Sequence, residues 1–184
     1  MRTEAGNDSP NQQEDLFSPA KTGKLKNNDM EKEEYMREAI RMATKNVAEG
    51  GGPFGAIIVK DGKVIGRGVN RVTAENDPTA HAEVRAIRDA AKGLSTFDLS
   101  GSEIYTSCEP CPMCLGAIYW AHISKIFYGN TKADAAAIDF DDSFIYKQIA
   151  TPESERAIPQ EHILGNEAIE TFKAWEAKTD KTEY

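Results

Sequence analysis

The chain has 184 residues, of which 22 are Lys or Arg and 30 are Asp or Glu, so its formal net charge at pH 7 is −8. This length favours one globular domain, and a hydrophobic fraction of 40% is typical of a chain that buries an apolar core. The negative charge disfavours a nucleic acid as the main partner, because phosphate backbones are bound by Lys and Arg. No apolar run approaches the roughly 20 residues that span a bilayer, and the N-terminus lacks the apolar core of a secretory signal. We therefore expect a cytoplasmic enzyme or binding domain with no membrane partner.

The N-terminal segment differs in composition from the rest of the chain. Residues 1–29 are rich in Pro, Ser, Asn and Gln and have almost no apolar periodicity, which predicts a disordered tail. The domain is therefore predicted to comprise residues 30–184. Its first element is a helix that begins at Met30, is capped by Asp29 and ends before Gly50. Apolar residues recur along one face of this helix at Met36, Ile40, Ala43 and Val47.

Strands and helices alternate along the remaining chain. The strands are expected at residues 56–59, 63–69, 103–107 and 125–129, and the helices at 80–92, 110–120, 140–149 and 165–178. Asp61-Gly62 is a two-residue hairpin signal between the first two strands, and Gly93 is expected to end the helix over 80–92. This order predicts an α/β fold of three layers, α/β/α, in which helices flank a central mixed sheet. The sheet would begin with an antiparallel hairpin and continue in βα units.

Two short stretches contain the residues that could carry chemistry, His81-Ala82-Glu83 and Pro110-Cys111-Pro112-Met113-Cys114. All cysteines lie between positions 108 and 114, a clustering that indicates metal or redox chemistry and not a disulfide framework. On a helix, Cys111 and Cys114 share a face, and in its first turn the helix dipole stabilises their thiolates. With His81 they supply three of the four ligands that zinc prefers, which leaves one position for water. We therefore predict one Zn²⁺ per subunit, bound by His81, Cys111 and Cys114.

Glu83 lies two positions after His81, so the two side chains do not share a helical face. It suits general acid–base catalysis on the water better than ligation. His-x-Glu followed by Pro-Cys-x-x-Cys is similar to the signature of zinc-dependent nucleobase deaminases. A structural zinc ribbon would need a second cysteine pair, and an iron–sulfur site would need a fourth thiolate before a proline. Cys108 would join the cluster on those alternatives, and it is otherwise a packed thiol at a strand end.

Four longer stretches resemble one family in particular. They are GGPFGAIIVKDG (51–62), NDPTAHAEV (76–84), YTSCEPCPMCLGAIYWA (105–121) and FDDSFIYK (140–147). Together with the final Glu-Tyr, they resemble the bacterial guanine deaminases of the cytidine/deoxycytidylate deaminase superfamily, from about residue 30 to the end. The resemblance implies a cytidine-deaminase-like fold and the hydrolysis of guanine to xanthine and ammonia. It also implies His81, Cys111 and Cys114 as zinc ligands and Glu83 as the proton shuttle.

The same resemblance assigns the substrate-binding residues. Asn70 and Asp142 match residues that contact the purine, whereas Phe54 and Trp120 match residues that line the base pocket. Without it, Asn70 would be a turn residue, Asp142 a solvated or capping residue, and the two aromatic residues part of the core. Tyr184 matches a terminal tyrosine that closes the active site of the partner subunit. This implies a homodimer in which the C-terminal segment is domain-swapped.

Three other functions remain open from the sequence. A guanosine or other nucleoside deaminase shares the zinc motifs and the GGPFGA stretch. A transfer-RNA adenosine deaminase needs a basic surface, often on the last helix, but residues 165–184 contain five acidic residues and three lysines. A non-catalytic zinc or iron–sulfur module would need neither Glu83 nor an open ligand position. The net negative charge favours a free base, guanine, as the substrate over any nucleic acid.

Overall fold

A computed structural model describes the backbone of residues 20–183 and the side chains of residues 29–183. Residues 1–19, most of the predicted disordered tail, lie outside the described part, as does Tyr184. The chain divides into two units, Met1–Glu33 and Glu34–Tyr184, and the sheet belongs to the second. Within residues 20–183, no helix has both the length and the apolar character needed to cross a membrane.

Helix α1 (Ala20–Ala48) begins ten residues before the predicted start at Met30. The predicted start is wrong because it rests on apolar periodicity, and adding residues to an existing helix requires none: propagation is much easier than nucleation. Asp29 therefore lies inside the helix and does not cap it. Its carboxylate instead forms an ion pair with Lys32, with a separation of 3.3 Å.

The buried face of α1 agrees with the predicted stripe at Met36 and Ala43 and differs from it at Ile40 and Val47. Ile40 and Val47 are 44% and 51% exposed, whereas Ala39, Ala43 and Asn46 are buried. The reason is a close approach by strand β1 (Gly55–Lys60): a Cβ at Gly55 would lie 2.5 Å from the carbonyl oxygen of Ala39. Small side chains are needed at this point of closest approach, whereas the larger Tyr35, Met36 and Met42 pack against the second buried cluster on the same face of the sheet.

The sheet has four strands in the order β2-β1-β3-β4. The other strands are β2 (Lys63–Val69), β3 (Glu103–Cys108) and β4 (Lys125–Asn130). β1 is antiparallel to both β2 and β3, and β3 is parallel to β4, which confirms the predicted mixed sheet. The hairpin between β1 and β2 turns at Asp61 and Gly62, whose φ angles of 50° and 72° are those of the tight turn that the sequence predicts.

The helices after the first hairpin agree with the predicted ones within a few residues. They are α3 (Ala82–Leu94), α4 (Pro112–Trp120), α6 (Ser143–Ala150) and α7 (Gly165–Ala177). The prediction that Gly93 ends the first of these helices is wrong: α3 continues through Gly93 to Leu94, and its C-cap residue, Ser95, takes the left-handed conformation. Three short elements are additional: α2 (Val72–Glu75), α5 (Lys132–Ala136) and the 3₁₀ turn Glu153–Glu155. They are too short to show the periodicity that predicts longer helices.

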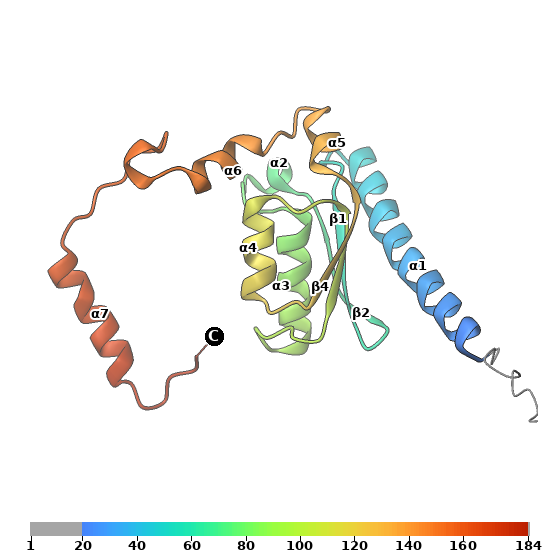
Figure 1. Ribbon diagram of the computed structural model, residues 1–184, viewed down its shortest axis with the longest axis horizontal. Helices are drawn as coiled ribbons and strands as arrows, with labels where there is room; N and C mark the ends of the chain where they lie inside the picture. The colour runs from blue at the N-terminus through green and yellow to red at the C-terminus, as the bar shows by residue number, and fades with distance from the viewer. Residues whose placement is uncertain (1–19, 184) are drawn as a thin grey trace, which may run out of the picture. The chain divides into compact units, whose positions relative to one another are not determined.

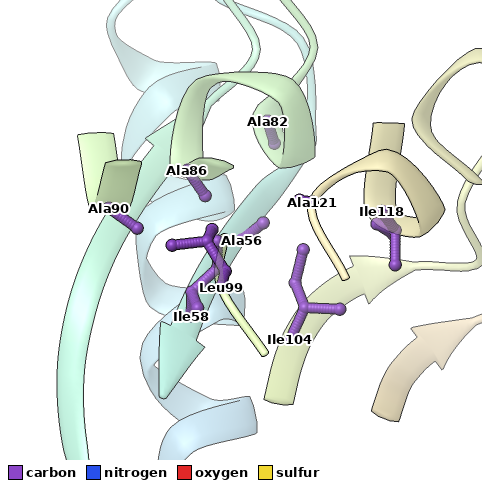
Figure 2. Close-up of a cluster of buried hydrophobic side chains, with 9 residues drawn as sticks. All are labelled: Ala56, Ile58, Ala82, Ala86, Ala90, Leu99, Ile104, Ile118 and Ala121. Carbon is purple, nitrogen blue, oxygen red and sulfur yellow. The ribbon is translucent and has the colours of Figure 1, made fainter. Parts of the chain in front are cut away.

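The helices form layers on both faces of the sheet, as predicted for an α/β/α fold. α3 and α4 cover one face, and the part of α1 that belongs to the second unit, from Glu34 onward, covers the other (Figure 1). Figure 2 shows Ala82, Ala86 and Ala90 of α3 packed toward Ile58 and the rest of this buried cluster. The approach is so close that a Cβ at Gly68 of β2 would lie 2.1 Å from the carbonyl oxygen of Ala82. This packing fixes the N-terminus of α3, where the His-x-Glu motif lies.

Candidate active site

Three predicted ligands converge where two helices begin. His81 is the N-cap residue of α3, Cys111 is the N-cap residue of α4, and Cys114 lies in the first turn of α4. The Nδ1 atom of His81 is 3.6 Å from the Sγ of Cys111 and 3.5 Å from the Sγ of Cys114. In a tetrahedral zinc site with Zn–N of about 2.0 Å and Zn–S of about 2.3 Å, such atoms lie roughly 3.5 Å apart. The two nitrogen–sulfur distances therefore match those of a zinc site, and all three ligand atoms lie within 4.8 Å of one another.

The charges in this cluster also suit a cation. The hydrogen bond from Cys114 lowers the pKa of Cys111, and the same bond raises the pKa of Cys114, because the two sulfur atoms share one proton. The hydrogen bond with Cys111 raises the pKa of His81 against the opposing effect of burial. A thiolate beside two helix N-termini is a ready ligand, and binding a dication would release the shared proton.

Glu83 lies beside the cluster in the first turn of α3 and is 6% exposed. Its Oε1 accepts a hydrogen bond from Thr106 Oγ1 and its Oε2 accepts one from Cys114 Sγ, each at 3.3 Å. Burial raises the pKa of this carboxyl group. A carboxylate that is held against the ligands, and whose pKa is shifted toward neutrality, is suited to accept and return a proton.

A cavity of about 430 Å³ opens next to the ligand cluster. Phe54, Asn70 and Asp142 line it together with His81, Glu83 and Cys111, so most of the predicted site residues come together. Its volume is within the range of roughly 300–1,000 Å³ that is usual for small-molecule sites. Trp120 is not among the residues that line it: it ends α4 and is 69% exposed. Tyr184 lies outside the described residues.

The polar groups of the cavity wall are held in defined orientations. The Oδ1 atom of Asn70 accepts a hydrogen bond from the backbone N–H of Val72 at 3.3 Å, so its amide NH₂ group remains to donate. Asp141 accepts the hydrogen bond from Ser143 N at the start of α6, whereas Asp142, its N-cap residue, makes no capping bond. Asp142 therefore lines the cavity without capping the helix, and partial burial raises the pKa of its carboxyl group.

Sequence reasoning missed several residues of the wall. Phe140 meets Phe54 edge to face, with ring centroids 4.9 Å apart, and both rings line the cavity. Lys132 also lines it, and its Nζ is 3.7 Å from Oε1 of Glu109. Phe140 and Glu109 belong to the quoted motifs, so their position there was an available signal. Lys132 follows β4 with no local motif, and only the fold places it at the site.

Cys108 does not belong to the metal cluster, which consists of His81, Cys111 and Cys114 in the described part of the chain. It is buried at the end of β3, and its Sγ donates to the carbonyl oxygen of Thr131 at 3.6 Å. Burial raises the pKa of this thiol to about 11, so Cys108 remains neutral where a ligand would be a thiolate. Cys108 therefore lines the cavity as a packed thiol and not as a metal ligand.

Comparison with known proteins adds independent information. Residues 29–130 match the model of the cytidine and deoxycytidylate deaminase zinc-binding region. A guanine deaminase of Bacillus subtilis is 52% identical over 156 residues, which cover 84% of this chain and 100% of that protein. The crystal structure of a B. subtilis guanine deaminase superposes with a TM-score of 0.80, at 52% identity, over 83% of this chain and 98% of that one. A tRNA-specific adenosine deaminase of Haemophilus influenzae is 40% identical over 60% of this chain and 67% of that protein.

Proposed function

Because the chain belongs to the zinc-binding cytidine and deoxycytidylate deaminase family, we propose that it hydrolyses guanine to xanthine and ammonia. The observation that carries the proposal is the cavity that joins the His81, Cys111 and Cys114 cluster to a buried Glu83. The identity of 52% to a guanine deaminase supports guanine among the bases that this family deaminates. The enzyme is a hydrolytic deaminase, and the free base is the substrate that we assign to it.

The metal ion and the side chains of the protein have separate roles in the proposed reaction. Zinc bound by His81, Cys111 and Cys114 supplies a Lewis acid that lowers the pKa of water. Glu83 accepts a proton from the attacking water, and a C–O bond forms at C2 of guanine. Glu83 passes this proton to the adjacent ring nitrogen, then takes the second water proton from the new C2 hydroxyl group and gives it to the amine; the C2–N bond breaks, ammonia leaves and C2 becomes the carbonyl carbon of xanthine. Burial raises the pKa of Glu83, which favours a carboxyl group that can both accept and return a proton.

The remaining groups orient the base. The carboxylate of Asp142 can accept hydrogen bonds from guanine N–H groups, and the amide of Asn70 can donate to a ring nitrogen or carbonyl oxygen. The paired rings of Phe54 and Phe140 give the cavity an apolar wall against which a flat purine packs. Trp120 is proposed as a pocket residue on the resemblance alone.

We also propose that the enzyme is a homodimer in which Tyr184 closes the active site of the partner subunit. Helix α7 supports this proposal, because it has apolar residues yet buries none of its side chains within the chain. Phe172 and Trp175 are 72% and 44% exposed. Such a surface is expected to be covered by another copy. The three free cysteines agree with a cytoplasmic location, in which thiols stay reduced.

Mixing two inactive variants tests the swap. A Glu83→Gln subunit keeps its terminal tyrosine, and a subunit that lacks Tyr184 keeps its glutamate. In a swapped heterodimer, one of the two sites has both residues, so co-expression should restore about one quarter of wild-type sites if subunits mix at random. No recovery in a sample that contains heterodimers would contradict the swap.

The substrate is tested by an ultraviolet assay of the zinc-loaded full-length protein on guanine, guanosine, cytosine and adenine side by side. We expect guanine to be converted fastest, with xanthine as the product and Glu83→Gln as the inactive control. Transfer RNA is included as a fifth substrate because of the similarity to tRNA-specific deaminases. Faster turnover of guanosine or of transfer RNA would overturn the assignment to the free base.

A further inference from the structure

Asn46 is a polar residue on the face of α1 that meets the sheet, and it is 1% exposed. Its Nδ2 atom donates to the carbonyl oxygen of Gly52 at 2.8 Å and to that of Asn70 at 2.7 Å. Its Oδ1 accepts from Arg71 Nη1 at 3.4 Å. One buried amide thus joins α1 to two separate segments, the loop before β1 and the turn after β2.

Both of these segments form walls of the active-site cavity. Gly52 and Phe54 contribute one wall, and Asn70 contributes the neighbouring one. The backbone N–H of Asn70 also donates to the carbonyl oxygen of Phe54 at 3.1 Å. Asn46, which does not line the cavity itself, therefore bonds the backbone of Asn70, a residue that does.

We propose that Asn46 is a positioning residue that sets the amide of Asn70 for purine binding. The proposal rests on the proposed function, since it assumes that Asn70 contacts the base. A buried amide with two donors is suited to this role because it fixes two carbonyl groups at once, whereas a hydroxyl group could fix only one. Its removal leaves the buried carbonyl group of Asn70 without this donor, takes one of two donors from the carbonyl group of Gly52, and releases the backbone that carries the Asn70 side chain.

The glycines of the loop show how tightly this amide fits. A Cβ at Gly51 would lie 2.3 Å from Nδ2 of Asn46, and one at Gly52 would lie 3.0 Å from Oδ1 of Asn70. No positive φ angle requires glycine at either position, so contact alone restricts the residue type at Gly51. The two asparagine side chains and this loop therefore form one packed unit, and a change at Gly51 reaches Asn46 directly.

A double-mutant cycle tests the proposal. Asn46→Ala should lower kcat/KM for guanine about 10- to 100-fold, the scale expected for a misplaced contact in an active site. In an Asn70→Ala background, the same change should cost less than about 3-fold, because the group that it positions is gone. Zinc content should stay at one per subunit, since the ligands lie on other elements. Equal losses in both backgrounds, or loss of zinc, would show that Asn46 only supports the fold.

Ser102→Ala is the matched control. Ser102 is fully buried, and its Oγ donates to the carbonyl oxygen of Leu99 at 2.6 Å, so the variant also loses a buried side-chain-to-backbone bond, outside the cavity wall. It should change kcat/KM less than about 2-fold. If Asn46→Ala fails to fold, Gly51→Ala takes its place in the cycle, because its methyl group displaces the same amide. Additive losses with Asn70→Ala would then overturn the proposal.

The experiment distinguishes failure of the proposed function from failure of the proposed role of Asn46. If wild-type enzyme does not convert guanine, the proposed function fails, and the cycle is measured on whichever base the enzyme does convert. If Asn70→Ala has no effect on that base, the assumed substrate contact is wrong. If Asn70→Ala is harmful and Asn46→Ala is harmless or additive, only the role of Asn46 is refuted.

Discussion

Replacing Gly68 with alanine tests whether the packing of β2 against α3 positions the catalytic motif. The new Cβ would lie 2.1 Å from the carbonyl oxygen of Ala82 and 2.5 Å from the backbone nitrogen of Ala86. Ordinary contacts begin near 3.4 Å, so α3 or β2 must move by about 1.3 Å. Ala82 lies between His81 and Glu83, and a shift of this size there displaces a metal ligand and the proton acceptor together.

The magnitude follows from that displacement. A misplacement of about 1 Å in an active site costs roughly 100-fold in rate, and overpacking costs about 1–3 kcal/mol of stability. At about 2–4 °C per kcal/mol for a domain of this size, the Tm should fall by about 2–12 °C. We therefore expect Gly68→Ala to be folded at 20 °C or below, with kcat/KM lowered about 100-fold and with weakened zinc binding.

The assay combines guanine turnover, zinc analysis and thermal unfolding of the same preparation. Gly93→Ala is the control because it makes the same substitution in α3, where the new Cβ would meet a single atom, the carbonyl oxygen of Ile65, at 4.0 Å. In a helix this change should raise stability by up to about 1 kcal/mol and leave kcat/KM unchanged. Wild-type kcat/KM, zinc content and Tm in Gly68→Ala would refute the reasoning.

The remaining predictions concern the site itself. Glu83→Gln should keep zinc and lower kcat at least about 100-fold, because glutamine fills the same space but cannot take a proton; an active variant would contradict its role. A chelator should abolish turnover, and circular dichroism should show that the fold is intact, because none of the three ligands belongs to the buried apolar cluster under α3. Added Zn²⁺ should then restore the rate. Activity of the metal-free protein would exclude this mechanism. Asp142→Asn should lower kcat/KM for guanine about 10- to 100-fold through the loss of a charged acceptor, with zinc unchanged, and steady-state kinetics that match wild type would remove Asp142 from the substrate site.

The zinc ligands and the proton-transferring glutamate were predictable because each belongs to a short sequence motif. The spacing of Cys111 and Cys114 and the pairing of His81 with Glu83 depend on helix geometry, which a sequence shows directly. The hairpin at Asp61-Gly62 is local in the same way, since the turn itself demands residues that accept a positive φ. The order of strands and helices then predicts the three layers.

The packing and hydrogen bonds that hold the site in place were not predictable from the sequence, because they depend on how closely a helix and a strand approach each other. The apolar stripe on α1 correctly selected Met36 and Ala43, but it also selected the exposed Ile40 and Val47 and missed the buried Ala39 and Asn46. A periodicity search ranks an asparagine as polar and therefore as exposed. Its burial follows from the small residues around it and from carbonyl groups on segments that are distant in sequence.

The same reasoning explains why Asn46 and Gly68 carry the two most informative experiments. Neither residue is a zinc ligand or lines the cavity, yet each fixes a segment that carries a reactive or binding group. Gly68 acts by having no side chain, which lets the N-terminus of α3 approach the sheet. Asn46 acts through its side-chain amide, which donates hydrogen bonds to the carbonyl oxygens of Gly52 and Asn70. If both perturbations lower activity while the fold persists, the geometry of the site depends on close packing and buried hydrogen bonds as much as on its ligands.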